Sequence, residues 1–392
     1  MFSSSISRKF IILFFGLIAF VLLTHFVGWR ERGLFDSYDT NNYYRFGSWY
    51  TLDQKPYKEV FSPYPQLATY LFALPHVIAN ELLKSYDEMD YKLIFSLLMM
   101  LVLFATILVL FMMRSDRKNY AFFMMLPACI FFAHQRYDIL PAFLGIISVF
   151  FLLKERYWTA ALFLALGVVA KWYLILLAPV LFRYAYLKRN KIDYSMIGIF
   201  ILTGMAFVLL TTMHSGFDAV LIPYRFHLGR PFNFESLFYH FKLLFDSLLN
   251  INIATKPVYS LFLLLQVAVM PFASRADIRS PRDVYAWSAL SILCFMLFSK
   301  FYSPQWILWV MPFLILWISN SRQAWAIVAF DVVTYLYFPI AFRNVDLSSI
   351  WFGLAIGIKN FLLILLMVLL VRTITRREGC EERKQCFTNP SV

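Results

Sequence analysis

Apolar residues gather along the chain in runs close to twenty residues long, and short polar segments separate these runs. About 20 apolar residues in a helix cross the roughly 30 Å of hydrocarbon in a bilayer. Backbone groups in lipid must be hydrogen-bonded within their own segment, so the runs predict helices. We expect an all-α fold, a polytopic transmembrane helical bundle of about twelve spans. The predicted spans are residues 10–29, 91–113, 119–134, 138–153, 157–170, 172–187, 194–213, 257–273, 284–299, 304–319, 323–341 and 350–371.

Two segments between spans are too long to be simple turns, residues 30–90 and 214–256. In the first, apolar residues recur from Leu67 to Ile78 at the spacing of an amphipathic helix. An aromatic stripe before it predicts a second helix in the membrane interface. This stripe consists of Tyr43, Phe46 and Tyr50. The second segment holds another interfacial candidate, formed by Leu237, Phe241, Leu244 and Leu248.

Charge indicates an orientation. Apolar residues make up 61% of the 392 residues and charged residues 15%, against roughly 45–50% and 25% in soluble domains. The net charge of +13 comes from residues scattered in alternate loops, which fits the positive-inside rule better than nucleic-acid binding. We expect a transmembrane domain over residues 1–371 with its N-terminus inside, an uncleaved first span after Arg8-Lys9, and a cytoplasmic basic tail over residues 372–392. The predicted location is the plasma membrane.

Several kinds of site have no motif in the sequence. There is no Walker loop, no GxGxxG, no HExxH and no CxxC. The four cysteines are too few and too scattered for a disulfide framework. We therefore expect no cofactor, no metal and no nucleotide-binding domain, which argues against a cytoplasmic sugar nucleotide as substrate.

Three cations break the orientation rule because they fall at the outer ends of spans. They are Arg136, Lys171 and Lys300, each within a polar cluster. Three cations on one face suit a phosphate or pyrophosphate at headgroup depth. Snorkelling to lipid phosphates is the alternative for each of them.

Acidic residues follow the first span. Asp36 and Asp39 precede the aromatic stripe, and a carboxylate there could take the proton from an acceptor hydroxyl that attacks a sugar carbon. Either residue could instead begin the interfacial helix as an N-cap. Asp331 lies inside an apolar run and needs a partner, for which we expect a structural role.

The second outer segment carries a mixed polar and aromatic stretch from Tyr224 to Ser236. Arginines, a histidine, a glutamate and aromatic residues alternate there, which suits a sugar and its phosphate. His227 could be an acid or base, although a lone histidine is more often a hydrogen-bonding residue.

Four motifs follow one another along the chain. They are Asp39–Arg45 with Lys55-Pro56-Tyr57 and Tyr64-Pro65, Asp138–Pro141 with Lys171 and Pro179, Arg225–Pro231 with Glu235-Ser236, and Phe298–Gln305. In pattern and order they resemble the GT-C superfamily of membrane glycosyltransferases, most closely its polyprenol-phosphate-mannose-dependent alpha-mannosyltransferase branch. The chain departs from that pattern at Asp53-Gln54, where a glycine is expected, and at Gln66, where a second proline is expected.

The resemblance implies a role for each matching residue. Asp39, with Asp36 beside it, would be the catalytic base. Donor phosphate contacts would come from Arg45, Lys171, Arg225, Arg230 and Lys300, to which the charge pattern adds Arg136. Sugar and acceptor contacts would come from Tyr43, Tyr64, His227, Glu235, Tyr302 and Gln305.

The hypothesis from sequence is an inverting hexosyltransferase. It would move a hexose, mannose first, from a polyprenyl phosphate to a glycolipid or glycan acceptor on the extracytoplasmic side. One alternative is a flippase or transporter of lipid-linked sugars, which predicts inverted repeats and broken helices. Another is an O-antigen-type polymerase or ligase. The expected partners are the lipid donor, the acceptor and membrane lipids, and not nucleic acid.

Overall fold

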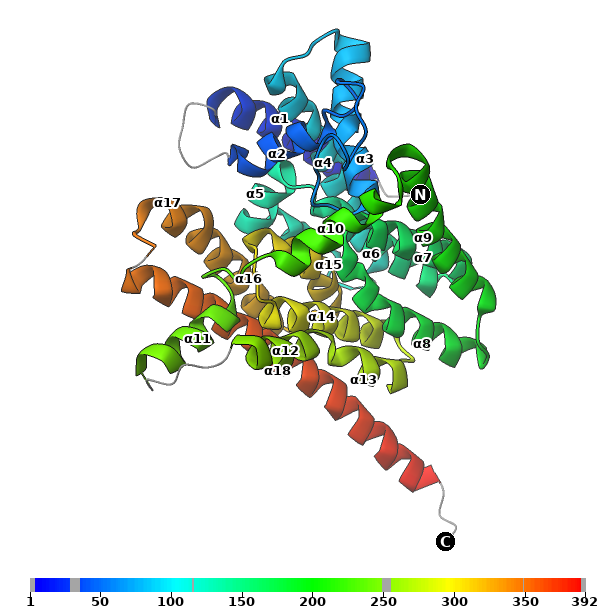
Figure 1. Ribbon diagram of the computed structural model, residues 1–392. Coiled ribbons are helices and arrows are strands. Elements are labelled where there is room, and N and C mark those ends of the chain that lie inside the picture. Colours follow the sequence, from blue (N-terminus) through cyan, green and yellow to red (C-terminus); the bar gives the residue numbers. More distant parts are fainter. Residues whose placement is uncertain (1–3, 29–35, 115, 249–254, 348, 389–392) are drawn as a thin grey trace.

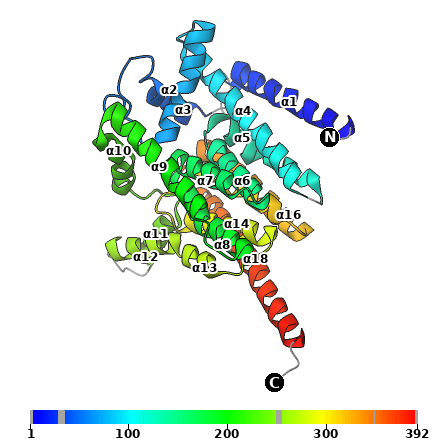
Figure 2. The same ribbon diagram turned by 90° about the vertical axis from the view of Figure 1, so that its right-hand side faces the viewer.

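The computed structural model describes residues 4–28, 36–114, 116–248, 255–347 and 349–388, and these residues form a helical bundle (Figures 1 and 2). Helices account for 81% of the chain, and the described residues contain no strand apart from an isolated bridge between Pro56 and Val60. The all-α prediction is confirmed.

The helices alternate with short 3-10 and π segments (η). In chain order they are α1 (Ser4–Gly28), α2 (Ser37–Gly47), α3 (Gln66–Val77), η1 (Ile78–Leu83), α4 (Glu88–Met113), η2 (Lys118–Met125), α5 (Pro127–Gln135), α6 (Ile139–Leu153), α7 (Tyr157–Ala170), η3 (Trp172–Leu177), α8 (Ala178–Arg189), α9 (Tyr194–Ser215), α10 (Phe217–Gly229), α11 (Leu237–Leu248), α12 (Thr255–Val267), α13 (Val269–Arg275), α14 (Pro281–Phe298), η4 (Pro304–Trp306), α15 (Ile307–Trp317), α16 (Ser321–Tyr335), η5 (Leu336–Ala341), α17 (Phe342–Asn344) and α18 (Ile350–Thr388).

Five helical stretches among the described residues are long and apolar enough to cross a membrane. They are Arg8–Val27, Glu88–Met113, Tyr194–Ser215, Ser321–Asn344 and Ile350–Thr375. A sixth is possible where α5 and α6 pass the same test together, although they are bent by 108°. The described residues therefore contain five to six membrane-capable helices, and the twelve-span count stays a prediction.

Several of the remaining predicted spans are shorter or divided helices, although 284–299 falls within α14, which has 18 residues. The predicted span 157–170 is α7, which has 14 residues and is about 21 Å long at 1.5 Å per residue. The predicted span 172–187 divides into η3 and α8, and 304–319 divides into η4 and α15. Residues 257–273 are shared between α12 and α13. Apolar composition alone does not tell a span from a buried core helix.

α15 shows this ambiguity most clearly. All eleven of its residues are buried, from Ile307 to Trp317. A helix that is apolar on every side belongs in the centre of a bundle or in lipid. It packs against α14 and α6, so protein rather than lipid surrounds it. By contrast, only 11% of the apolar window of α9 is buried.

The two helices predicted between residues 30 and 90 are present, and their position at a membrane interface stays a prediction. α3 covers the predicted amphipathic stretch, and α2 holds Tyr43 and Phe46. The two helices cross at Gly47, where an added Cβ would lie 2.1 Å from the backbone oxygen of Phe72. The predicted helix of the second outer segment is α11, which begins at Leu237.

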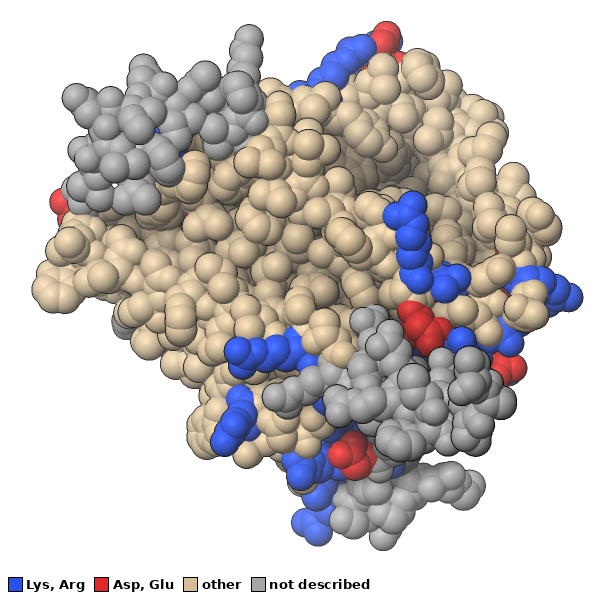
Figure 3. All heavy atoms as spheres, turned by 90° about the horizontal axis from the view of Figure 1, so that it is seen from below, with Lys and Arg blue, Asp and Glu red and all other residues tan. Residues whose placement is uncertain are grey.

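Charged side chains are concentrated on part of the surface. On the face seen from below, uncharged residues form most of the surface, and most Lys and Arg side chains lie in its lower and right-hand parts, with others at the upper edge (Figure 3). α8 and α13, in the lower part of Figure 1, carry Lys188, Arg189 and Arg275 in their last turns. The positive-inside rule predicts that such basic helix ends lie on the inner side, and the orientation of the chain remains a prediction.

Candidate functional site

A buried arginine joins the first outer segment to the break between α5 and α6. Arg136 follows α5 and is 3% exposed. Its Nη2 lies 2.5 Å from Oδ2 of Asp36, and its Nε lies 2.7 Å from Oδ2 of Asp39. Its Nη1 also donates to the backbone carbonyl of Asp36 at 3.2 Å. One guanidinium therefore holds two carboxylates.

The two aspartates have different positions on α2. Asp36 is the N-cap, and its Oδ1 accepts a hydrogen bond from the backbone N–H of Tyr38 at 3.2 Å. The alternative that Asp39 caps the helix is therefore wrong, because Asp36 fills that position. Asp39 lies in the first turn, where its Oδ2 also accepts a hydrogen bond from Nε2 of Gln305 at 3.3 Å.

The surroundings shift the pKa values of these two carboxyls in opposite directions. Burial raises the pKa of Asp39 above its usual value, and the carboxylates of Asp36 and Asp138 add to the rise. The cations Arg136 and Lys171 oppose this rise without cancelling it. Burial also acts to raise the pKa of Asp36, but the charge and hydrogen bond of Arg136 outweigh it and leave that pKa below its usual value. A raised pKa suits a proton acceptor, so Asp39 fits the expected role of a base better than Asp36 does.

A second ion pair lies on the other side of the same break. Nζ of Lys171 is 2.5 Å from Oδ1 of the fully buried Asp138, which also accepts from Nε1 of Trp309 at 2.6 Å. The ammonium lies 4.6 Å from the ring centroid of Tyr137 and 4.9 Å from that of Trp309. A carboxylate and aromatic rings thus enclose Lys171, and Asp138 balances its charge.

Predicted sugar contacts in the first outer segment form an aromatic wall. Tyr43 is fully buried, stacks on Phe72 at 4.5 Å between centroids, and lies 5.8 Å from Tyr64. Tyr64 in turn packs 5.1 Å from Tyr137. Tyr43 has a packing role in the structure. Tyr64 is half-buried, packs beside Tyr43 and lies between this aromatic wall and Lys171.

Two further cations lie on the second outer segment and on the loop after α14. The Arg230 guanidinium sits 3.3 Å from the ring centroid of Phe301, and Nζ of Lys300 donates to the backbone carbonyl of Leu228 at 3.2 Å. Burial lowers the pKa of Arg230, and Tyr64 and Asp39 oppose this shift. Within the described ranges, no carboxylate is close enough to form a salt bridge with Arg230. Arg230 is therefore the cation best placed to receive an anion near Asp39.

Two predicted phosphate ligands lie apart from this group. Arg45 is exposed and lines a shallow outer cleft with Glu88, on a different face of α2 from Asp39. The side chain of Arg225 is 65% exposed, and its nearest carboxylate, at 3.8 Å, is that of the exposed Asp218. Neither residue joins Arg136, Lys171 and the rest of the cluster.

His227 is a hydrogen-bonding residue, which is the alternative that the sequence left open for it. Its Nε2 lies 3.0 Å from the backbone carbonyl of Pro63, an acceptor, so this nitrogen carries the proton. Burial, with the nearby Arg230, lowers the pKa of His227 to about 4. A neutral histidine that links α10 to the first outer segment is a positioning group rather than an acid.

A third polar group lies around Glu235. The sequence predicted Glu235 and Tyr302 as site residues, but it did not predict the group that they form. Glu235 is 7% exposed, and its carboxylate accepts hydrogen bonds from the Tyr337 hydroxyl and from Nδ2 of Asn233, the latter at 2.9 Å. Nζ of Lys359 donates to the backbone carbonyl of Glu235 at 3.0 Å. Tyr302 is 1% exposed and packs within this group. The signal in the sequence was Lys359 itself, a lysine inside the predicted span 350–371.

Asp331 has the structural role expected of it. Its two carboxylate oxygens accept hydrogen bonds from the backbone N–H groups of Ala128 and Cys129, at 2.9 and 3.0 Å. These N–H groups belong to the first turn of α5, which has no other partner for them within the helix. Asp331 therefore fixes α16 to the start of α5.

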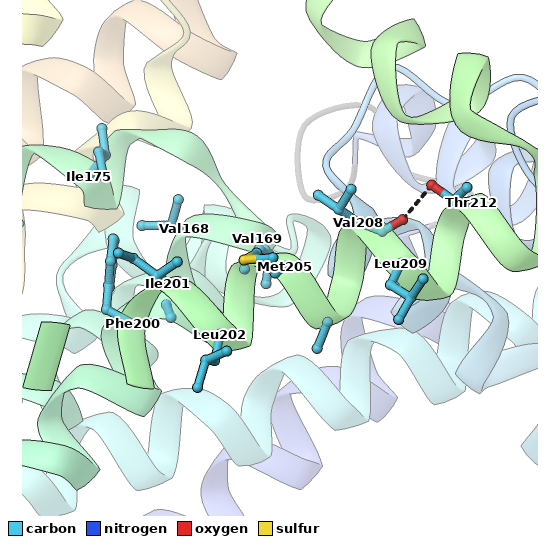
Figure 4. Close-up of a pocket in the computed structure, with 13 residues that line it drawn as sticks. Val168, Val169, Ile175, Phe200, Ile201, Leu202, Met205, Val208, Leu209 and Thr212 are labelled. Carbon is cyan, nitrogen blue, oxygen red and sulfur yellow. Dashed lines mark hydrogen bonds between the residues drawn. The ribbon is translucent and has the colours of Figure 1, made fainter. Parts of the chain in front are cut away.

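An apolar groove runs between α7, η3 and α9 (Figure 4). Its volume is about 770 Å³. It is lined by residues that include Val168, Ile175, Phe200, Met205, Val208 and Leu209. Ile175 belongs to η3, which begins directly after Lys171, so one short segment connects the groove to the charged cluster.

Over the part of the chain that the structure describes, no group of three or more His, Cys, Asp or Glu side chains could hold a metal ion. No protein-family model matches the chain, and no curated protein matches it. The likeness to the GT-C superfamily therefore depends on the four sequence motifs.

Proposed function

We propose that this chain is an inverting membrane glycosyltransferase that takes a hexose, mannose first, from a polyprenyl phosphate and transfers it to a glycolipid or glycan acceptor on the extracytoplasmic side. The observation that carries the proposal is the position of Asp39. Its carboxyl has a raised pKa, lies outside the membrane-capable helices, and interacts electrostatically with Lys171 and Arg230.

The reaction follows from a base and an anion site placed side by side. Asp39 accepts the proton of the acceptor hydroxyl, and the oxygen forms a bond to the anomeric carbon of the sugar. The bond between that carbon and the phosphate oxygen breaks, and the phosphate leaves with the electron pair. One direct displacement inverts the anomeric configuration.

The leaving phosphate gains charge and needs cations that are not already neutralised. Arg136 and Lys171 each have a carboxylate partner within 2.5 Å, so we assign them to the positioning of Asp36, Asp39 and Asp138. Arg230 is assigned to the phosphate. Lys300 is assigned as a second phosphate contact because its Nζ donates to the backbone carbonyl of Leu228, close to Arg230 along the chain.

The apolar groove is the proposed binding site of the polyprenyl chain. α9 forms one wall and is mostly unburied by protein, so the groove opens where lipid would be. A polyprenyl chain in it would run toward η3, and η3 begins beside Lys171. The phosphate would then reach the charged cluster while the chain stays in hydrocarbon.

The proposal is tested with purified protein and a panel of polyprenyl phosphate sugars, together with membrane glycolipid extracts as acceptors. The expected result is consumption of one donor, release of polyprenyl phosphate and a product of inverted anomeric configuration. A panel in which no donor is consumed, or a product that retains configuration, would contradict it.

One observation favours a flippase for lipid-linked sugars as a second candidate. The 108° bend between α5 and α6 places Arg136 and Asp138 at a helix break, and broken helices with charged residues are typical of transporters. Movement of a fluorescent polyprenyl phosphate sugar across proteoliposomes, without consumption, would favour this function.

A further inference from the structure

Lys359 is a fully buried lysine in a membrane-capable helix. It lies ten residues into α18, and apolar residues dominate the sequence on both sides of it. An ammonium ion in such a place is costly unless partners compensate for it, and such residues are usually functional. The partners of Lys359 therefore indicate what it does.

The hydrogen bond and the ring contacts of its ammonium group are all made with residues outside α18. Nζ donates to the backbone carbonyl of Glu235 at 3.0 Å and sits 3.4 Å from the ring centroid of Tyr302. A second ring, that of Tyr337, is 5.7 Å away. A cation over an aromatic face is attracted strongly when water is excluded. Lys359 thus connects α18 to the second outer segment, to the loop after α14 and to η5.

Asn233 ties those two loops into one unit. Its Nδ2 donates to the backbone carbonyl of Tyr302 at 2.7 Å, and its Oδ1 accepts from the backbone N–H of Tyr302 at 3.0 Å. Its own N–H donates to the backbone carbonyl of Lys300 at 3.2 Å. The same Nδ2 reaches the carboxylate of Glu235. The unit therefore contacts Lys359 through Tyr302 and Glu235.

The same unit carries the two cations assigned to the donor phosphate. Arg230 lies three residues before Asn233, with its guanidinium on the ring of Phe301. Lys300 precedes that ring directly. A shift of the unit would move both cations relative to Asp39, since Asp39 is fixed to α5 through Arg136.

We propose that Lys359 is a positioning residue, which holds the two outer loops against α18 and thereby sets Arg230 and Lys300 at the donor phosphate. This assignment rests on the proposed function for the identity of the ligand. Lys359 touches neither sugar nor phosphate in this arrangement. Its effect passes through Glu235 and Tyr302.

The first test measures loop placement without any substrate. In a background with the four native cysteines replaced by serine, Ser236→Cys places a thiol at a position that is 1% exposed. The rate at which a maleimide labels purified protein then reports how tightly the loop packs. Lys359→Met should raise this rate at least about tenfold, as expected when buried packing opens locally. Lys359→Arg, which keeps the charge over the Tyr302 ring, should restore slow labelling.

The second test measures binding of polyprenyl phosphate without a sugar. Lys359→Met should weaken the apparent affinity for polyprenyl phosphate about tenfold. This is the change expected when Arg230 or Lys300 is displaced and one charge-assisted contact with the phosphate is lost. Lys92→Met is the matched control, because Lys92 is another buried lysine in a membrane-capable helix and pairs with Glu88 at 2.5 Å. It should leave both readouts unchanged.

Each result decides between the two proposals. Unchanged labelling and unchanged affinity in Lys359→Met would overturn the positioning role while the proposed function survives. Equal effects in Lys92→Met would overturn it too, because any buried lysine would then do the same. Wild-type protein that binds no polyprenyl phosphate would overturn the proposed function, and the assignment of Lys359 to a phosphate site with it.

Discussion

Asp39 and Asp331 are both largely buried carboxylates, but their partners differ. The oxygens of Asp331 accept hydrogen bonds from two backbone N–H groups of α5. Those of Asp39 face side chains, namely Arg136 at 2.7 Å and Gln305 at 3.3 Å. Asp331 is fully buried, whereas the side chain of Asp39 is 16% exposed.

The difference separates a structural acid from a chemical one. Backbone N–H groups in the first turn of a helix cannot turn away, so the interactions of Asp331 are permanent. Arginine and glutamine side chains can exchange one partner for another when a substrate arrives. Burial of a carboxylate alone therefore predicts little, and the kind of partner it has predicts its role.

The largest effect is expected at the chemical end of the comparison. Asp39→Asn should lower the rate of sugar transfer about a thousandfold, because the amide cannot accept the hydroxyl proton. The melting temperature in detergent should change little, since Arg136 keeps its ion pair with Asp36 and the amide oxygen can still accept from Arg136 and Gln305. Asp87→Asn is the control, because Asp87 caps α4 on the same outer segment by accepting from the N–H of Met89 at 2.9 Å. A transfer rate in Asp39→Asn equal to that of this control would remove Asp39 as the base.

The structural end should respond in stability. Asp331→Ala leaves two buried N–H groups of α5 without an acceptor, which we expect to cost about 3 kcal/mol. The melting temperature should fall, while transfer per folded molecule stays the same. Asp331→Asn keeps one acceptor oxygen and should lose about half as much. A reduced rate in the remaining folded protein would mean that the two aspartates do not divide structure and chemistry in this way.

A smaller effect is expected for the cations. Arg230→Met should raise the apparent KM for the lipid donor about tenfold through the loss of a charge-assisted contact. Arg225→Met removes an arginine from the same outer segment, but one whose side chain is 65% exposed, and it should leave KM unchanged. Donor titrations on the two variants decide the matter, and equal KM values would contradict the assignment.

The smallest effect is a shift in pH dependence. Burial raises the pKa of Asp39, so the base form is lost on acidification at a higher pH than an ordinary carboxyl would require. Transfer should therefore rise with pH through that raised pKa and then level off. Asp36→Asn removes a negative charge that contributes to the rise and should move the acidic limb to lower pH by about one unit or less. Rate profiles of the two proteins test this, and a limb that moves to higher pH would contradict it.

Much of the candidate site could be found along the chain because its residues break local rules. Arg136, Lys171 and Lys300 are cations at the ends of apolar runs, and Asp36 and Asp39 follow the first run directly. The structure brings Asp39 together with Arg136 and within electrostatic range of Lys171. What could not be predicted is how the cations pair. Asp138 engages Lys171 across 33 residues of sequence, a distance that no local pattern encodes.

The sequence by itself determined that the chain is helical and rich in membrane-capable segments, because apolar run length and period are local properties. It also determined the helices α2, α3 and α11, whose amphipathic faces can be read within one segment. Only the tertiary structure decided that protein encloses α15 and leaves most of α9 uncovered. It also decided that Lys359 contacts the unit of loops that carries Arg230 and Lys300. The reason is physical. An apolar helix surface can be buried by lipid or by another helix, and a buried charge pairs with whichever group the fold brings close to it.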